Sequence, residues 1–201
     1  MSVYPFSPSP SYNLTTNYAI WENGFTDDEI DKILDLGESR RINEAVVGDK
    51  KNKKINDKIR KSKTSWIQCA PDSEWLYDKL AYIARKLNGE FFRFDLCGFV
   101  EDMQFTIYNG DEQGHYNAHI DMAGPGGDMP QRKLSLVVQL TDPDKYEGGD
   151  LQLYCGGDPE PVKKQKGLVV AFPSYLLHEV TPVTSGIRRS LVIWVGGPPF
   201  K

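Results

Sequence analysis

Residues 103–121 read MQFTIYNGDEQGHYNAHID. The segment from Met103 to Tyr108 has the composition and alternation of a β-strand, and so does the segment from Tyr116 to Asp121. Side chains on a strand repeat with a period of two, so His119 and Asp121 should point to the same side with backbones about 6–7 Å apart. The sequence therefore predicts that this H-x-D pair lies within reach of one metal ion.

A third candidate ligand, His178, lies near the start of a later predicted strand. Two imidazoles and one carboxylate can hold a non-haem Fe(II) on one face and leave its other positions open for oxygen and an organic co-substrate. An H-x-D pair alone arises easily by chance, but the turn after His178 leads into a strand that begins with Arg188. An arginine fork grips a carboxylate with two parallel hydrogen bonds, so Arg188 is a candidate co-substrate anchor.

Two neighbouring residues offer alternatives. His115 and His119 form an H-x-x-x-H pair, which on a helix would indicate the zinc site of a hydrolase. On a strand the two residues would be about 13 Å apart, too far for one ion, so we interpret His115 as a surface or pocket-rim residue. Arg189 alternates away from Arg188, so only one of them can contact the co-substrate, and Ser190 shares the face of Arg188.

Length and composition favour an ordinary globular protein. The chain has 201 residues, 39% hydrophobic and 26% charged, with a net charge of −4. A chain of this size buries about two-thirds of its unfolded surface, and its charge gives no general attraction to nucleic acid or anionic membranes. The three cysteines are far apart and odd in number, which favours reduced thiols in the cytoplasm. No secretion signal or membrane span is evident.

The chain is expected to form a single domain, residues 1–201. Residues 1–17 should form an extended arm, residues 18–95 a helical support with a basic loop, and residues 96–201 the catalytic core. A capping-box pattern predicts a helix from Thr26 to Gly37. Helical periodicity predicts a second helix from Trp75 to Leu87, ended by Asn88-Gly89.

From Phe91 onward, short strands separated by Gly, Pro and Asp replace the helical pattern. This change predicts a mainly β fold with helical support, an α+β double-sheet jelly roll whose N-terminal helices pack on one sheet. The strongest strand candidates are Met103–Tyr108, Lys133–Leu140, Asp150–Tyr154, Gly167–Phe172 and Arg188–Val195.

The motif set over residues 98–197 resembles the prolyl 4-hydroxylase-like 2-oxoglutarate/Fe(II) dioxygenases, including the bacterial PKHD-type hydroxylases. The resemblance rests on Tyr108, His119-x-Asp121, Arg132-Lys133-Leu134-Ser135, Gly148-Gly149-Asp150-Leu151, His178-Glu179-Val180 and Gly186-x-Arg188-x-Ser190. It implies a double-stranded β-helix in which His119, Asp121 and His178 bind Fe(II). It also implies that Arg188, with Ser190 on its face, pairs with 2-oxoglutarate, that Tyr108 donates a hydroxyl to the same end, and that O2 is consumed with ascorbate as the usual reductant.

The resemblance implies hydroxylation of a C–H bond, with a proline of a protein or peptide as the expected target. A free amino acid or another small molecule, or a barrel that has lost its chemistry, are the alternatives. Gln104, Thr106 and Trp194 are candidates for the substrate pocket, although core packing would explain Gln104 and Thr106 equally well and is the simpler explanation for Trp194. The basic segment 50–63 is either a solvated loop or a contact surface for an acidic partner, and the Gly-rich segment 124–130 is either a lid or a plain connection.

Overall fold

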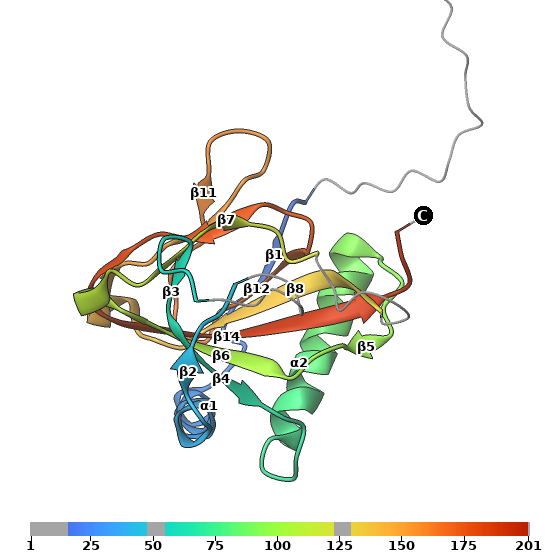
Figure 1. The fold of residues 1–201 in the computed structure, drawn as a ribbon. Coiled ribbons are helices and arrows are strands. Elements are labelled where there is room, and N and C mark those ends of the chain that lie inside the picture. The colour runs from blue at the N-terminus through green and yellow to red at the C-terminus, as the bar shows by residue number, and fades with distance from the viewer. Residues whose placement is uncertain (1–15, 48–54, 123–129, 201) are drawn as a thin grey trace, which may run out of the picture.

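The structure is a computed structural model that describes residues 16–47, 55–122 and 130–200. Two antiparallel β-sheets face each other, and two α-helices cover the outer side of the larger sheet (Figure 1). The predicted double-stranded β-helix with helices on one sheet is therefore confirmed. Residues 1–15 of the predicted arm 1–17, residues 50–54 of the basic segment 50–63 and residues 124–129 of the proposed lid 124–130 lie outside the described residues.

The larger sheet has the strand order β1-β12-β8-β14-β6-β4-β2, and β5 and β9 also pair with β14. Its strands are β1 (Ala19–Trp21), β2 (Asn43–Glu44), β4 (Lys63–Ile67), β5 (Gly98–Phe99), β6 (Met103–Asn109), β8 (Gln131–Gln139), β9 (Tyr146–Gly148), β12 (Val169–Pro173) and β14 (Val183–Gly197). The smaller sheet has the order β11-β10-β13-β7-β3. Its strands are β3 (Arg60–Lys61), β7 (His115–His119), β10 (Leu151–Leu153), β11 (Glu160–Pro161) and β13 (His178–Val180).

Helix α1 (Asp27–Ser39) begins where the capping box predicts. The Thr26 hydroxyl accepts a hydrogen bond from the Glu29 amide, and the Glu29 carboxylate accepts one from the Thr26 amide at 2.8 Å. This reciprocal pair satisfies two amides that the first turn of a helix leaves without partners. The helix runs two residues past the predicted end at Gly37, because Gly37 serves close packing and does not terminate it.

Helix α2 (Glu74–Leu87) matches the predicted span and ends at Asn88, as predicted, but the chain does not leave the helical path there. The chain continues through a π-helical turn, Asn88–Phe92, and leaves it at Arg93, which has a left-handed backbone. The Asn88 side chain bonds both the amide and the carbonyl of Phe94 at 2.9 Å and so holds the turn in place. Neither α-helix in the described ranges has the length and apolar character of a bilayer-spanning segment.

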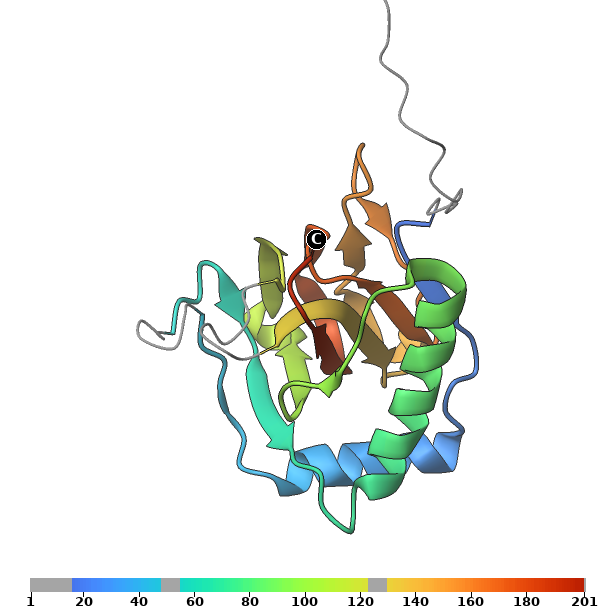
Figure 2. The ribbon, with the colours of Figure 1, turned by 90° about the vertical axis from the view of Figure 1, so that its right-hand side faces the viewer.

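Alternation along β14 divides the protein into two cores. Leu191, Ile193 and Val195 belong to one apolar cluster with residues of both helices. Figure 2 shows the two helices beside the larger sheet. The residues of opposite parity face the interior between the sheets, where Val192 joins a second apolar cluster that includes Tyr108 and Val180. The outer core supplies most of the apolar burial, and the inner face is left to carry the polar residues of the candidate site.

Gly37 brings α1 directly against the larger sheet. A Cβ atom at this position would overlap the Phe105 ring of β6, which is fully buried. The Ser65 hydroxyl of β4 also donates a hydrogen bond to the Gly37 carbonyl at 2.6 Å. The absence of a side chain at Gly37 therefore sets the distance between helix and sheet.

Replacing Gly37 by Ala should destabilise the fold by about 1–3 kcal/mol, because the added methyl group forces the helix away from Phe105. Urea unfolding followed by circular dichroism measures the effect. Gly89→Ala is a matched control, because a Cβ at Gly89 meets nothing within 4 Å and its backbone is not left-handed. Equal stability of the two variants would contradict this account of the packing.

Candidate metal centre

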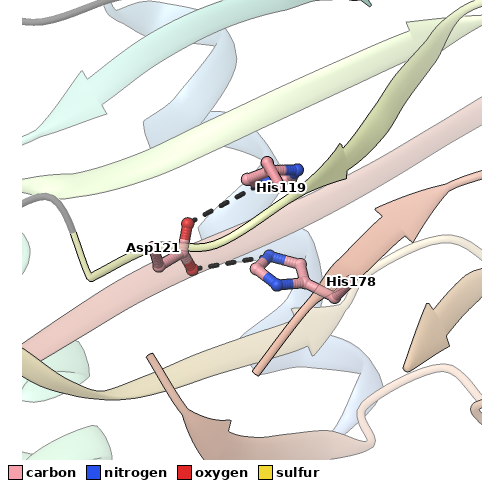
Figure 3. Close-up of side chains that lie close together, drawn as sticks. All are labelled: His119, Asp121 and His178. Atoms are coloured by element: carbon pink, nitrogen blue, oxygen red, sulfur yellow. Dashed lines mark ion pairs between the residues drawn. The ribbon is translucent and has the colours of Figure 1, made fainter. Parts of the chain in front are cut away.

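His119, Asp121 and His178 converge from two strands and a loop (Figure 3). His119 ends β7 and His178 begins β13, and the two residues lie directly opposite each other in the antiparallel pairing. The Asp121 carboxylate lies between the two rings, 3.6 Å from His119 Nε2 and 3.5 Å from His178 Nε2. The ligand atoms of the three residues lie within 4.8 Å of one another, so the structure brings together the predicted group.

The predicted strand through Asp121 ends two residues earlier in the structure, so the prediction of its C-terminal end was wrong. Strand β7 stops at His119, and Ile120 is 46% exposed, because the chain leaves the sheet there. The Asp121 amide instead donates a hydrogen bond to the Ser174 carbonyl at 2.8 Å. The Ser135 hydroxyl of β8 donates to Asp121 Oδ2, also at 2.8 Å, so the carboxylate is oriented by the larger sheet as well as by β7.

Backbone carbonyls fix the orientation of both imidazole rings. His119 Nδ1 lies 2.8 Å from the Asn117 carbonyl, and His178 Nδ1 lies 2.9 Å from the Leu176 carbonyl. A carbonyl only accepts, so each Nδ1 must be the protonated nitrogen, and each Nε2 lone pair is left facing Asp121. This is the arrangement by which proteins usually prepare histidine ligands for a metal.

The electrostatics of the group keep the His119 imidazole neutral and the Asp121 carboxylate ionised. Burial, followed by the proximity of His178, lowers the pKa of His119 to about 4. Burial by itself would raise the pKa of the Asp121 carboxyl, but His178, His119 and the Ser135 hydrogen bond together hold that pKa below its ordinary value. At neutral pH the ligand set therefore consists of a neutral His119 imidazole and an Asp121 carboxylate beside His178.

This donor set fits Fe(II). Two imidazole nitrogens and one carboxylate oxygen form the facial triad of non-haem Fe(II) sites, which leaves positions for co-substrate and oxygen. The group found among the described residues contains these three ligands and no fourth. Asp121 and His178 are buried, and His119 is half-buried.

Arg188 lies on the inner face of β14 and is only 2% exposed. Its Nη1 contacts the Ser190 hydroxyl at 3.4 Å, and its guanidinium carbon lies 5.3 Å from the centre of the Tyr108 ring. In the described part of the chain no carboxylate forms an ion pair with it. A buried guanidinium with only neutral contacts fits a bound carboxylate such as that of 2-oxoglutarate. Arg189 points outward and pairs with Glu38 of α1 at 2.9 Å.

The remaining residues that the sequence suggested for the site lie at separate positions in the structure. Gln104 and Thr106 are buried on β6, and the Thr106 hydroxyl donates to the Gln104 side-chain oxygen at 3.3 Å. Trp194 is buried on β14, and its ring lies 6.2 Å from that of the exposed Trp66. His115 begins β7 and bonds the Gln113 carbonyl through Nδ1 at 2.8 Å. His115 is not part of the metal-ligand group.

Three residues near the centre were not among the sequence candidates. The Tyr116 ring stacks on His119 with 3.6 Å between ring centres. Arg132 lies 3.8 Å from the centre of the Trp194 ring and pairs with Glu101 through two nitrogens, at 2.8 and 2.6 Å. Arg60 packs over the Tyr116 ring, with its guanidinium carbon 4.6 Å from the ring centre. The sequence could have indicated Tyr116, because it lies three residues before His119. Arg60 could not be distinguished from the other basic residues around it.

Residues 103–196 match the family model of the 2OG-Fe(II) oxygenase superfamily. This segment, which contains His119, Asp121, His178 and Arg188, is similar to the proteins of that superfamily. The predicted relationship to prolyl hydroxylase-like and PKHD-type proteins is confirmed.

A PKHD-type hydroxylase of Synechococcus sp. (strain CC9311) is 37% identical over 92 residues, which are 46% of this chain and 41% of the relative. Another, from Pseudoalteromonas atlantica, is 32% identical over 119 residues, 56% of this chain and 52% of the relative. The chain thus spans about half the length of these curated relatives, or less.

Solved structures show the same fold over nearly the whole chain. A Pseudomonas putida prolyl-4-hydroxylase superposes with a TM-score of 0.69 at 20% identity, covering 92% of this chain and 95% of that one. A Trichoplax adhaerens prolyl hydroxylase, solved with a peptide fragment of the hypoxia inducible factor oxygen degradation domain, gives 0.72 at 21% identity, covering 91% and 85%.

The lowered pKa of His119 predicts how the stability of the metal-free protein depends on pH. Between about pH 6.5 and pH 4 the unfolded chain binds a proton at His119 that the folded chain does not, so the free energy of unfolding should fall as the pH is lowered. In His119→Gln this decline should be shallower. Urea unfolding in the presence of a chelator at a series of pH values measures it, and equal slopes for the two proteins would contradict the assignment.

Proposed function

We propose that the protein is a 2-oxoglutarate-dependent Fe(II) dioxygenase that hydroxylates a C–H bond. The observation that carries the proposal is the His119, Asp121 and His178 group, which shares the interior between the sheets with a buried Arg188 that has no carboxylate partner among the described residues. The first group fits a ferrous ion, and the second fits a dicarboxylate co-substrate.

Each residue would have a separate task. His119, Asp121 and His178 would hold the iron, with Ser135 and the Asn117 and Leu176 carbonyls fixing their orientation. Arg188 would bind the distal carboxylate of 2-oxoglutarate, with Tyr108 and Ser190 supporting it from the same face of the sheet. Bound iron and 2-oxoglutarate would supply the activation of O2, which inserts one oxygen atom into the substrate C–H bond while 2-oxoglutarate becomes succinate and CO2. Ascorbate would serve as the reductant that keeps the iron ferrous.

We further propose that the substrate is a proline in a protein or peptide. The structural likeness to prolyl hydroxylases, one of them solved with a peptide, supports this choice. Gln104, Thr106 and Trp194 would then line the substrate side of the centre. A free amino acid remains the second candidate substrate. A barrel without chemistry is disfavoured, because all three metal-ligand positions and Arg188 are intact.

We also propose a domain organisation and a cellular location for the protein. Residues 18–95 would act as support and residues 96–201 as the catalytic core of one domain, because both helices and the larger sheet share one apolar cluster. A cytoplasmic location would suit the three free cysteines, Cys69, Cys97 and Cys155.

Replacing His119 by Ala should lower Fe(II)-dependent succinate release by more than about a hundredfold, since even partners outside the ligand set typically contribute 10–100-fold to metal affinity or activity. Succinate is measured with and without added Fe(II) and 2-oxoglutarate. His115→Ala is the control, because His115 lies on the same strand outside the ligand group. Robust turnover without iron or 2-oxoglutarate would refute the proposed function.

Replacing Arg188 by Gln should raise KM for 2-oxoglutarate about 10–100-fold, because a hydrogen bond to a charged group contributes about 1.5–3 kcal/mol. Initial rates of succinate release over a range of 2-oxoglutarate concentrations measure the change, while Fe(II) binding should persist. Arg189→Gln removes a neighbouring charge on the opposite face and should leave KM unaltered. If both variants shift KM equally, Arg188 is not the anchor.

A further inference from the structure

Arg60 joins the two sheets at one edge of the barrel. It belongs to β3 of the smaller sheet, and after Ser62 the chain crosses into β4 of the larger sheet. Its Nε donates to the Ser62 hydroxyl at 2.9 Å, and its Nη2 donates to the Gln104 side-chain oxygen on β6 at 2.8 Å. The residue is 7% exposed, so its charge lies inside the protein.

The charge of Arg60 is not balanced by an acid in the described part of the chain. Its hydrogen-bond partners are a hydroxyl and an amide, and its guanidinium carbon lies 4.6 Å from the centre of the Tyr116 ring. By contrast, Arg132 and Arg189 each form an ion pair with a glutamate. A guanidinium has five N–H donors, and a buried charge without a counter-ion is costly. Arg60 therefore has both the charge and the spare donors for an anionic ligand.

Arg60 is also close to the metal centre. The guanidinium stacks on Tyr116, and Tyr116 stacks on His119 with 3.6 Å between ring centres. Gln104, which accepts from Arg60, lies on β6 with Thr106 and Tyr108, and β6 pairs with the strand that carries Arg188. Arg60 is thus linked to the ligand histidine through the Tyr116 ring and lies apart from the Tyr108 and Ser190 surroundings of Arg188.

We propose that Arg60 is a specificity-determining residue that binds a carboxylate of the primary substrate, close to the C–H bond that is hydroxylated. This inference rests on the proposed function and narrows it to acidic substrates. The carboxylate would come either from an Asp or Glu side chain near the target residue of a peptide, or from the α-carboxylate of a free amino acid. Lys58, which forms no ion pair among the described residues, would add attraction for such a substrate.

A purely structural role for Arg60 makes a different prediction. If the residue only ties β3 to β6, its replacement would lower stability and would affect acidic and neutral substrates equally. If it binds a substrate carboxylate, the unmodified protein must already prefer the acid over its amide. The rates of the unmodified protein with the acidic substrate and with its amide therefore decide between the two roles, even if an Arg60 variant fails to fold.

The test uses pairs of probes that differ only in one charge. Blocked prolyl peptides carry Glu or Gln on either side of the proline, and L-proline is compared with L-prolinamide. Hydroxylation is followed by the mass gain of one oxygen, in the presence of Fe(II), 2-oxoglutarate and ascorbate. We expect kcat/KM for the acid to exceed that for its amide by about 10–100-fold in one family of probes, which identifies the source of the carboxylate. No acid preference in any pair, including no turnover of any acidic probe, would overturn the proposal.

Arg60→Gln should remove the acid preference mainly through a higher KM for the acidic probe, and Arg60→Lys should restore part of it. Lys61→Gln is the matched control, because it deletes the same charge from the neighbouring position of β3 and should keep the preference. Succinate released without any primary substrate reports on the proposed function independently. If that release persists while acid and amide are treated alike, the inference about Arg60 fails and the oxygenase proposal stands.

Discussion

The antiparallel pairing of His119 with His178 across β7 and β13 is the contact on which the candidate site depends. It brings residues far apart in the sequence to adjacent positions, and backbone carbonyls set the orientation of both rings. The third ligand, Asp121, is held by Ser174 and by Ser135 of the opposite sheet. The metal centre therefore requires both sheets, and the spacing between them is part of its geometry.

Apolar burial in the outer core offsets the energetic cost of the buried polar groups at the site. The outer core, with the helices packed on one face of the larger sheet, buries most of the large apolar side chains. The opposite side of the larger sheet faces the smaller sheet, and two buried guanidinium groups lie there, Arg188 of β14 and Arg60 of β3. Each contacts an aromatic ring and neutral oxygens. Such groups lower stability unless an anion joins them. A substrate and a co-substrate that each contribute a carboxylate would therefore stabilise the structure that binds them.

The sequence predicts the fold and the ligand group well, because both rest on strong local patterns. The capping box at Thr26 and the alternation around Arg188 correspond directly to α1 and β14. The errors arise where tertiary contacts override local preference. Asp121, for example, leaves its predicted strand and bonds the Ser174 carbonyl. The burial of Arg60 could not be predicted, because no local sequence pattern distinguishes a buried arginine from its solvated neighbours.

The continuous strand β14 (Val183–Gly197) has an evolutionary consequence. It pairs with β5, β6, β8 and β9, and it presents Arg188 inward and Arg189 outward. Inserting or deleting one residue within it would exchange the two faces and place a core side chain where the guanidinium belongs. Among the described residues the short β3 pairs only with β7, over two residues, so fewer contacts restrict its length. Divergence in substrate choice among descendants of this gene should therefore accumulate at β3, while β14 keeps a constant length.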